Sequence, residues 1–174
     1  MNPLIVPIQG KIPKIHPSCL IFPNATIIGE VEIGEKSSLW SQVTIRGDVF
    51  AIKIGKEVNI QDGTVIHGTF GKCGTILHDR VTVGHSVVLH GCEVGRGTLV
   101  GMGSIIMDQA KIGSHCLIGA GSLVTEGSEF PDKSLIVGRP AKVKRLLTEE
   151  EIKSLEHSAD NYLLYSSWYD FQLG

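Results

Sequence analysis

Residues 92–124, CEVGRGTLVGMGSIIMDQAKIGSHCLIGAGSLV, place a branched aliphatic side chain at every sixth position. The same step of six recurs through most of the chain and is broken where it becomes nine, eleven or five residues. Two residues before each aliphatic lies a small or β-branched side chain, with Pro13 as the exception. This period is typical of neither an α-helix, with 3.6 residues per turn, nor a long alternating strand. The aliphatic positions are Ile15, Ile21, Ile27, Ile33, Leu39, Ile45, Ile54, Ile60, Ile66, Leu77, Val83, Leu89, Val94, Val100, Ile106, Ile112, Ile118 and Val124.

Each hexapeptide is therefore interpreted as a very short strand followed by a bend. The aliphatic and the small residue before it point inward, and we expect the glycine that often follows to supply backbone freedom at the corner. Three such sides close a coil of about 18 residues, and coils stack through parallel strands about 4.8 Å apart. The sequence predicts an all-β parallel β-helix of about six triangular coils over residues 1–147, stabilised by stacking. A β-sandwich would not keep this register.

A different pattern begins at Thr148, which forms a T-x-x-E capping box with Glu151. Apolar residues then follow at steps of three or four, beginning at Ile152, Leu155 and Ala159. This spacing predicts one amphipathic helix that runs to about Tyr165. Residues 148–174 are expected to pack as helix and tail on the flank of a β-helix, in the same domain.

Composition excludes several classes of function. The chain has 174 residues, 42% of them apolar, and a formal net charge of −2, so no nucleic-acid partner is indicated. We find neither a membrane span nor a secretory signal and expect a cytoplasmic protein. Cys19, Cys92 and Cys116 occupy the small inward positions, so we interpret them as reduced core residues and not as metal ligands. Cys73 lies outside the register and receives no role.

Two histidines follow inward aliphatics directly, so the pleat turns His67 and His90 outward. They are 23 residues apart, which is one coil of about 18 plus five extra residues, and the glycine-rich residues 67–74 can loop out those five. Both would then lie on one face of successive coils, at a separation that suits binding of one ion with Zn–N distances near 2.1 Å. His85 falls on a different face and cannot reach the same ion within one chain.

A three-fold assembly of triangular prisms would bring a neighbour's different face alongside, so His85 could come from the next subunit. Three histidines and one open position are typical of a catalytic zinc site. Spacing alone leaves open the alternative of three solvated histidines. The basic residues of the exit segment also allow two interpretations, a contact with coenzyme A or phosphate and a solvated face: Arg139, Lys142, Lys144 and Arg145.

Three motifs carry a resemblance to the γ-class carbonic anhydrases, a left-handed β-helix hexapeptide family, over nearly the whole chain. They are SLWSQVTIRGD (residues 38–48), VNIQDGTVIH (58–67) and VTVGHSVVLHGCEVG (81–95). The GRPAK segment (138–142) is also shared with hexapeptide acyltransferases. The resemblance implies a left-handed helix and a homotrimer that hydrates CO2 reversibly to bicarbonate through a metal-bound hydroxide. It also implies that His67, His90 and the neighbouring subunit's copy of His85 bind zinc, with cobalt or iron as alternatives.

The resemblance implies roles for four further residues. Arg46 and Asp48 match the family's interfacial ion pair. Gln61 would orient the metal-bound water or the substrate, and Asp62 would help to hold Arg46. The alternative for Arg46, Asp48 and Asp62 is a purely structural salt-bridge network between subunits.

The chain departs from the most active type of the family in the residues for proton transfer. Val49 stands where that type carries a glutamate, and the loop after His67 is short and lacks acids. Hydration is therefore expected to be slow, with proton export by buffer or by His78, Tyr162 or Tyr165. Two other functions stay open: a hexapeptide acyltransferase or acyl-CoA thioesterase, and a non-catalytic metal-binding trimer.

Overall fold

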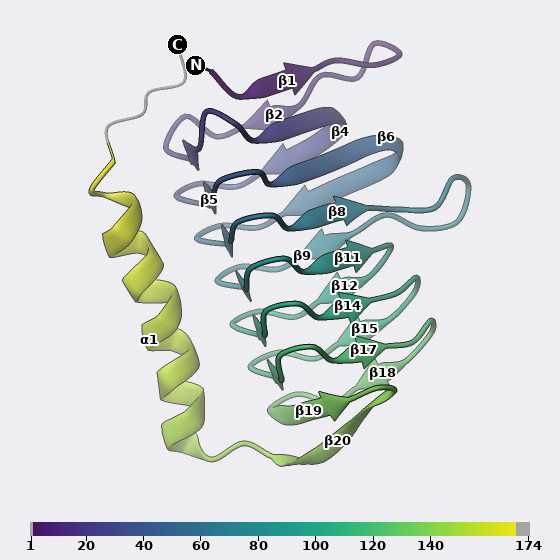
Figure 1. The fold of residues 1–174 in the computed structure, drawn as a ribbon, viewed down its shortest axis with the longest axis vertical. Helices are drawn as coiled ribbons and strands as arrows, with labels where there is room; N and C mark the ends of the chain where they lie inside the picture. Colours follow the sequence, from purple (N-terminus) through teal and green to yellow (C-terminus); the bar gives the residue numbers. More distant parts are fainter. Residues whose placement is uncertain (1, 170–174) are drawn as a thin grey trace.

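The computed structural model describes residues 2–169, which form a stack of three-sided coils with one helix alongside (Figure 1). The first face holds β1 (Leu4–Val6), β8 (Val65–His67), β11 (Val88–His90), β14 (Ile105–Ile106) and β17 (Leu123–Val124). The second face holds β2 (Lys14–Ile15), β9 (Ile76–Leu77), β12 (Glu93–Val94), β15 (Lys111–Ile112) and β18 (Glu129–Phe130). The long strands β4 (Thr26–Ile33) and β6 (Thr44–Ile54) cross from the first face to the second.

The third face gives the number of coils. Its strands are β3 (Leu20–Ile21), β5 (Ser38–Leu39), β7 (Asn59–Ile60), β10 (Thr82–Val83), β13 (Leu99–Val100), β16 (Leu117–Ile118), β19 (Ser134–Gly138) and the antiparallel β20 (Ala141–Leu146). The parallel rungs from β3 to β19 mark about seven coils, so the expected six was slightly low. Beyond the predicted series, β1 precedes its first residue, and β18 and β19 continue the period of six at Phe130 and Ile136. The architecture otherwise confirms the predicted parallel β-helix and fits the left-handed form.

The predicted core is confirmed. From Ile21 to Val124, every aliphatic of the six-residue series is at most 4% exposed. The three cysteines at small inward positions are also buried and carry free thiols. Burial raises the pKa of Cys19 to about 11 and that of Cys92 to about 12, so both stay protonated and behave as small apolar groups. The inward pattern therefore specifies the core.

The eleven-residue step is a loop, as the spacing predicts. Residues 68–74 leave the coil, and an antiparallel bridge joins Thr69 to Cys73 at the base of the loop. The strands on either side keep their register, with Ile66 opposite Leu89 on the first face and Leu77 opposite Val94 on the second. The insertion therefore changes one corner and leaves the stack intact.

The expected role of the glycines after the inward aliphatics was wrong. Gly95 does not have a left-handed φ, and a Cβ there would lie 2.5 Å from the backbone carbon of Gly113 in the next coil. The left-handed conformation falls two residues later, at Gly97 with φ +65°. Other corners place a non-glycine residue at this second position, for example Lys36 with φ 57°. The glycine after the aliphatic therefore allows successive coils to approach closely.

We predict that Gly95→Ala will destabilise the fold by about 2–3 kcal/mol, because the new methyl group has to displace backbone. Gly127 is the matched control, since it has φ +66° and a Cβ there would meet nothing within 4 Å. Gly127→Asn should change stability by less than about 1 kcal/mol, because asparagine tolerates the left-handed region. Urea unfolding midpoints at equal protein concentration would test this, and equal midpoints for the two variants would refute it.

The helix α1 (Glu149–Ser166) covers the third face. Two outward side chains of this face, Asn59 and Thr82, are at most 3% exposed. The capping box is present at Thr148 and Glu151, which confirms the predicted helix start. Within residues 2–169, no helix combines the length and apolar character needed to span a bilayer. The predicted tail at residues 170–174 lies outside the described residues.

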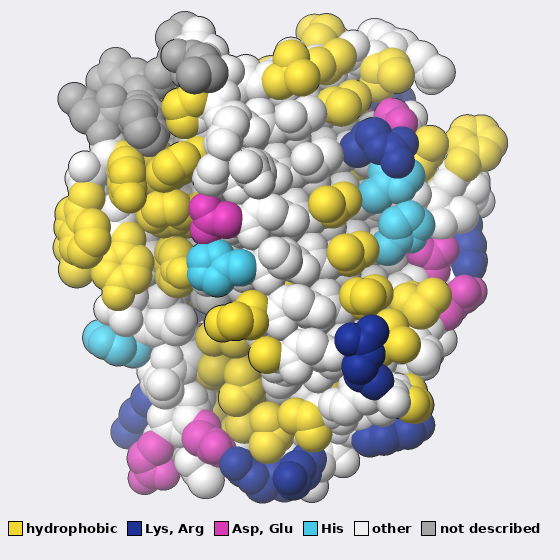
Figure 2. Space-filling view, in the orientation of Figure 1, with side chains coloured by type: hydrophobic (Ala, Val, Ile, Leu, Met, Phe, Trp, Pro, Cys, Tyr) yellow, Lys and Arg dark blue, Asp and Glu magenta, His cyan; other side chains and the backbone are white. Residues whose placement is uncertain are grey.

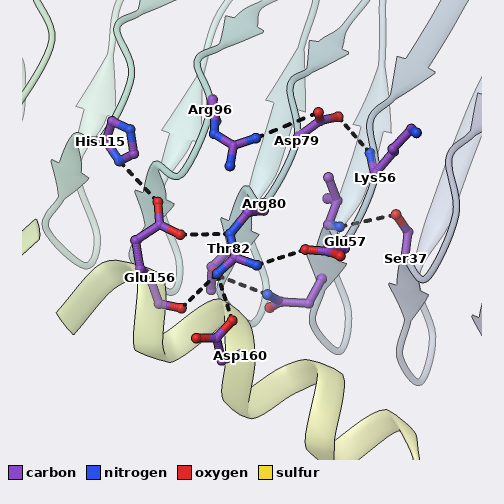
Figure 3. Close-up of polar contacts among 12 residues, drawn as sticks. Ser37, Lys56, Glu57, Asp79, Arg80, Thr82, Arg96, His115, Glu156 and Asp160 are labelled. Carbon is purple, nitrogen blue, oxygen red and sulfur yellow. Dashed lines mark hydrogen bonds and ion pairs between the residues drawn. The ribbon is translucent and has the colours of Figure 1, made fainter. Parts of the chain in front are cut away.

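Arg80 fixes α1 to the coils through three carboxylates (Figure 3). Its guanidinium donates to Glu57, Glu156 and Asp160, each at 2.7 Å. The Arg80 side chain is only 15% exposed, so these ion pairs are partly shielded from solvent. Leu155 and Ala159 are buried on the same helix. The apolar stripe and this ion-pair cluster together set the position of α1.

Candidate metal centre

His67 and His90 lie on adjacent strands, β8 and β11, and their Cα atoms are register partners. His67 Nδ1 is 3.2 Å from His90 Nε2, and the ring centroids are 5.2 Å apart. Two ligand nitrogens of a tetrahedral zinc ion with Zn–N distances near 2.1 Å stand about 3.4 Å apart. The structure therefore places the two rings at a separation that suits one shared ion.

A carboxylate contacts the other nitrogen of each ring. His67 Nε2 lies 3.1 Å from Asp48 Oδ1, and His90 Nδ1 lies 2.5 Å from Asp108 Oδ1. Each carboxylate accepts a hydrogen bond from the ring N–H that it contacts, which leaves the lone pairs of the two facing nitrogens directed at each other. Metal-binding histidines characteristically donate their second nitrogen to a carboxylate or carbonyl. The donor set therefore fits a divalent cation that accepts imidazole nitrogen.

Arg46 completes this side of the site. Its Nη1 donates to Asp48 Oδ2 at 2.6 Å, and its Nη2 lies 3.4 Å from His67 Nδ1. Burial lowers the pKa of His67, and the charge of Arg46 acts in the same direction. Burial raises the pKa of Asp48, but hydrogen bonds from Arg46 and His67 outweigh it and the net pKa is lowered. His67 is therefore held neutral, the form that binds metal.

The sequence interpretation missed Asp108. Its side chain is 12% exposed and accepts from Thr69 Oγ1 at 2.6 Å as well as contacting His90. Burial raises its pKa, but the hydrogen bonds from Thr69 and His90 prevail and bring the pKa to about 2. Asp108 lies in the turn after Met107, so it is neither an inward aliphatic nor the small residue that precedes one. The period does not point to it, because Leu89 pairs with Ile106, 17 residues on, and Asp108 falls one residue past the position level with His90. We call Arg46, Asp48, His67, His90 and Asp108 the paired-histidine half-site.

The third predicted ligand, His85, lies elsewhere. It lies in the turn before β11, whereas His90 ends that strand. His85 Nδ1 contacts Asp62 Oδ2 at 2.9 Å, and both side chains are 48% exposed. Within one chain Asp62 thus partners His85, while Arg46 lies with Asp48. His85 with Asp62, and His67 with His90, therefore lie at opposite edges of the first face.

Gln61 lies beside Asp62 and is 6% exposed, with its amide nitrogen donating to Asn59 Oδ1 at 3.2 Å. Tyr162 of α1 is close enough to Asp62 for that charge to raise its pKa, after the larger effect of burial. Tyr165 packs edge-on against Tyr162 at a centroid distance of 5.4 Å. We call Gln61, Asp62, His85 and Tyr162 the single-histidine half-site.

His78 joins neither half-site. It follows Leu77 on the second face and contacts Glu93 at 2.8 Å. Within residues 2–169 of a single chain, no three side chains among His, Cys, Asp and Glu gather in a geometry that could hold a metal ion. The chain alone therefore supplies two incomplete halves of the predicted site.

Comparison with known proteins shows which family the chain resembles. The family described as bacterial transferase hexapeptide (six repeats) matches residues 12–47 and 91–126. A protein named carbonic anhydrase from Geobacillus kaustophilus is 46% identical over 95% of this chain and 91% of its own length. The gamma carbonic anhydrase 2, mitochondrial, of Arabidopsis thaliana is 41% identical over 88% of this chain and 57% of its own length.

A solved structure of a hexapeptide transferase family protein from Anaplasma phagocytophilum superposes with a TM-score of 0.92. It is 43% identical and covers 96% of this chain and 98% of its own. Proteins described as transferases and proteins named carbonic anhydrase both occur among relatives of similar identity. On the identity to the carbonic anhydrases over most of its length, the chain belongs to the γ-class carbonic anhydrase-like family of hexapeptide-repeat proteins.

Proposed function

We propose that the protein is a metal-dependent carbonic anhydrase that converts CO2 and water to bicarbonate and a proton as a homotrimer. The observation that carries this proposal is the pair of facing nitrogens on His67 and His90, each ring held by its own carboxylate. His85 of the adjacent subunit would be the third ligand. Zinc is the proposed metal, and cobalt or iron would suit the same imidazole donors.

The outward side chains of the three faces support a trimer built through the first face. On the second face the outward positions of successive rungs carry mainly charged residues, namely Lys53, Ile76, Glu93, Lys111 and Glu129. On the third face α1 covers the outward positions. On the first face they are threonines on two early rungs, Thr26 and Thr44, and apolar residues from β8 onward, namely Val65, Val88, Ile105 and Leu123. Apolar side chains run down the middle of this face in Figure 2, and such a patch favours burial against another subunit.

A three-fold arrangement would also complete the site. The paired-histidine half-site and the single-histidine half-site lie at opposite edges of the first face. Rotation about a three-fold axis can bring one edge of each subunit against the other edge of its neighbour. The trimer would then hold three equivalent sites, each with two histidines from one chain and one from the next.

A bound zinc ion would acidify a water molecule and so supply the nucleophile for CO2. The chain's own residues would orient the reactants. Asp48 and Asp108 hold the two imidazoles, and Arg46 neutralises Asp48 at the edge of the site. Gln61 is fixed by Asn59, so its amide would present a directed dipole to the substrate or the water.

Proton export would limit the rate. Burial and the charge of Asp62 raise the pKa of Tyr162, so its phenol stays protonated at neutral pH and cannot accept a proton there. His78 lies on another face. With Val49 and the acid-free loop in place of the expected glutamates, dissolved buffer would carry the proton. We therefore expect the turnover number to rise with the concentration of imidazole buffer.

Metal analysis combined with stopped-flow CO2 hydration tests the proposal. A trimer with about one zinc per chain and buffer-dependent hydration would support it. A trimer that binds no metal would overturn it, and metal without hydration in any buffer would favour a non-catalytic metal-binding trimer. Binding of acyl-CoA without a need for metal would favour an acyltransferase or thioesterase. Of the four basic residues of the exit segment, Arg145 already pairs with Glu151, at 2.7 and 2.8 Å.

A further inference from the structure

We propose that Asp108 is a positioning residue that fixes the tautomer and ring orientation of His90 and joins this ligand to the loop of residues 68–74. The inference rests on the proposed metal site, and it assigns a function to a loop that carries no acid. Asp108 would act through His90 and would touch neither the metal nor the substrate.

Both oxygens of the carboxylate are engaged, on opposite sides. Oδ1 lies 2.5 Å from His90 Nδ1, and Oδ2 accepts from Thr69 Oγ1 at 2.6 Å. Lys72 Nζ lies 3.4 Å from the same Oδ2. The side chain is only 12% exposed, so these contacts compete little with water. The carboxylate therefore bridges a ligand ring and a loop.

The loop is built to hold that bridge. Its base is closed by Thr69 N donating to Cys73 O at 2.9 Å, and Lys72 N donates to Thr69 O at 3.1 Å. Lys72 is anchored further by Glu126 at 2.6 Å. Thr69 and Lys72 thus both point at Asp108 from a closed turn. The insertion between β8 and β9 supplies the two groups that fix the second oxygen.

Glycine at position 91 leaves room for the contact between His90 and Asp108. A Cβ at Gly91, directly after His90, would lie 2.9 Å from Asp108 Oδ1 and 2.5 Å from Cys73 Sγ. A side chain there would force the carboxylate or the loop away from the ring. Glycine at this position therefore permits the close approach of His90, Asp108 and the loop.

The chemical consequence is a single tautomer. A carboxylate at Nδ1 keeps the proton on that nitrogen, so Nε2 of His90 carries the lone pair that faces His67. Loss of Asp108 would free the ring to rotate and to take the other tautomer. Residues that hydrogen-bond the second nitrogen of a metal-binding histidine typically change metal affinity 10–100-fold.

Zinc affinity and histidine tautomers test the inference. Asp108→Ala should weaken zinc binding about 10–100-fold in competition with a chromophoric chelator. Asp108→Asn keeps an acceptor at Nδ1 and should lose less. Asp79→Asn is the matched control, because Asp79 Oδ1 accepts from Lys56 N at 2.9 Å at a different corner. Its zinc affinity should stay within about twofold of the parent protein.

A long-range ¹H–¹⁵N spectrum of the metal-free protein gives a readout independent of zinc. His90 should be the Nδ1–H tautomer in the parent protein and a mixture in Asp108→Ala. Parental zinc affinity together with an unchanged tautomer in Asp108→Ala would overturn the inference while the proposed function stands. A parent protein that binds no zinc would overturn the proposed function, and the tautomer spectra would still decide whether Asp108 sets the ring. If Asp108→Ala fails to fold, Asp108→Leu, which fills the same space without an acceptor, carries both measurements.

Discussion

Replacing His90 by alanine is expected to weaken zinc binding roughly 10²–10³-fold, since each ligand of a zinc site contributes about 3–4 kcal/mol. CO2 hydration should fall to background with it. The substitution should leave the fold intact, because His90 points outward and its side chain is 38% exposed. Zinc affinity, hydration and the urea unfolding midpoint of the metal-free variant would be measured together.

His78→Ala is the matched control. His78 also follows an inward leucine, but it lies on the second face beside Glu93. Its removal should leave zinc affinity and hydration unchanged in saturating buffer. If His90→Ala retained the parental zinc affinity, the paired-histidine half-site would not be the metal site.

Co-expression of two inactive variants gives a sharper form of the same test. His85→Ala chains keep the paired histidines, and His90→Ala chains keep the third ligand. In random mixed trimers, about one quarter of the sites would draw each part from an intact chain. Zinc binding and hydration should therefore reappear in the mixture to about that extent. Failure of the mixture to recover either property would argue against a site shared between subunits.

The sequence specified inward positions better than outward ones. Period six identified the core aliphatics, and counting five extra residues before Leu77 placed His67 opposite His90. Asp108 lies in the turn after β14, one residue past the position level with His90, so the strand register could not predict its contact with that ring. The role of Gly95 escaped for a related reason, because the distance between successive coils becomes visible only when they are stacked.

The position of Asp62 shows a further limit. The family resemblance assigns it to Arg46, yet within one chain it contacts His85 at the opposite edge of the first face. A contact between Asp62 and Arg46 would have to cross a subunit boundary. Four residues thus have expected roles that depend on the trimer, and these roles stay predictions: Arg46, Asp48, Gln61 and Asp62.

Ile105→Glu is expected to convert the proposed trimer to monomers. Ile105 is an outward residue of β14 between Val88 and Leu123, so a glutamate there would carry an unpaired charge into each interface. Burial of such a charge costs several kcal/mol, and about 3 kcal/mol per interface weakens association more than a hundredfold. The coil itself should tolerate the change, because the side chain points away from the core.

Ile76→Glu separates an interface effect from a general effect of charge on the coils. Ile76 is the outward residue of β9 on the charged second face and is 38% exposed, so its variant should remain trimeric. Analytical ultracentrifugation would compare the two variants, and zinc titration would follow on the same samples. In the proposed trimer the copy of His85 that completes each site belongs to another chain, so monomeric Ile105→Glu should lose tight zinc binding although all three histidines are present. An Ile105→Glu monomer with parental zinc affinity would show that one chain holds the whole site, and an Ile105→Glu trimer would remove the first face from the interface.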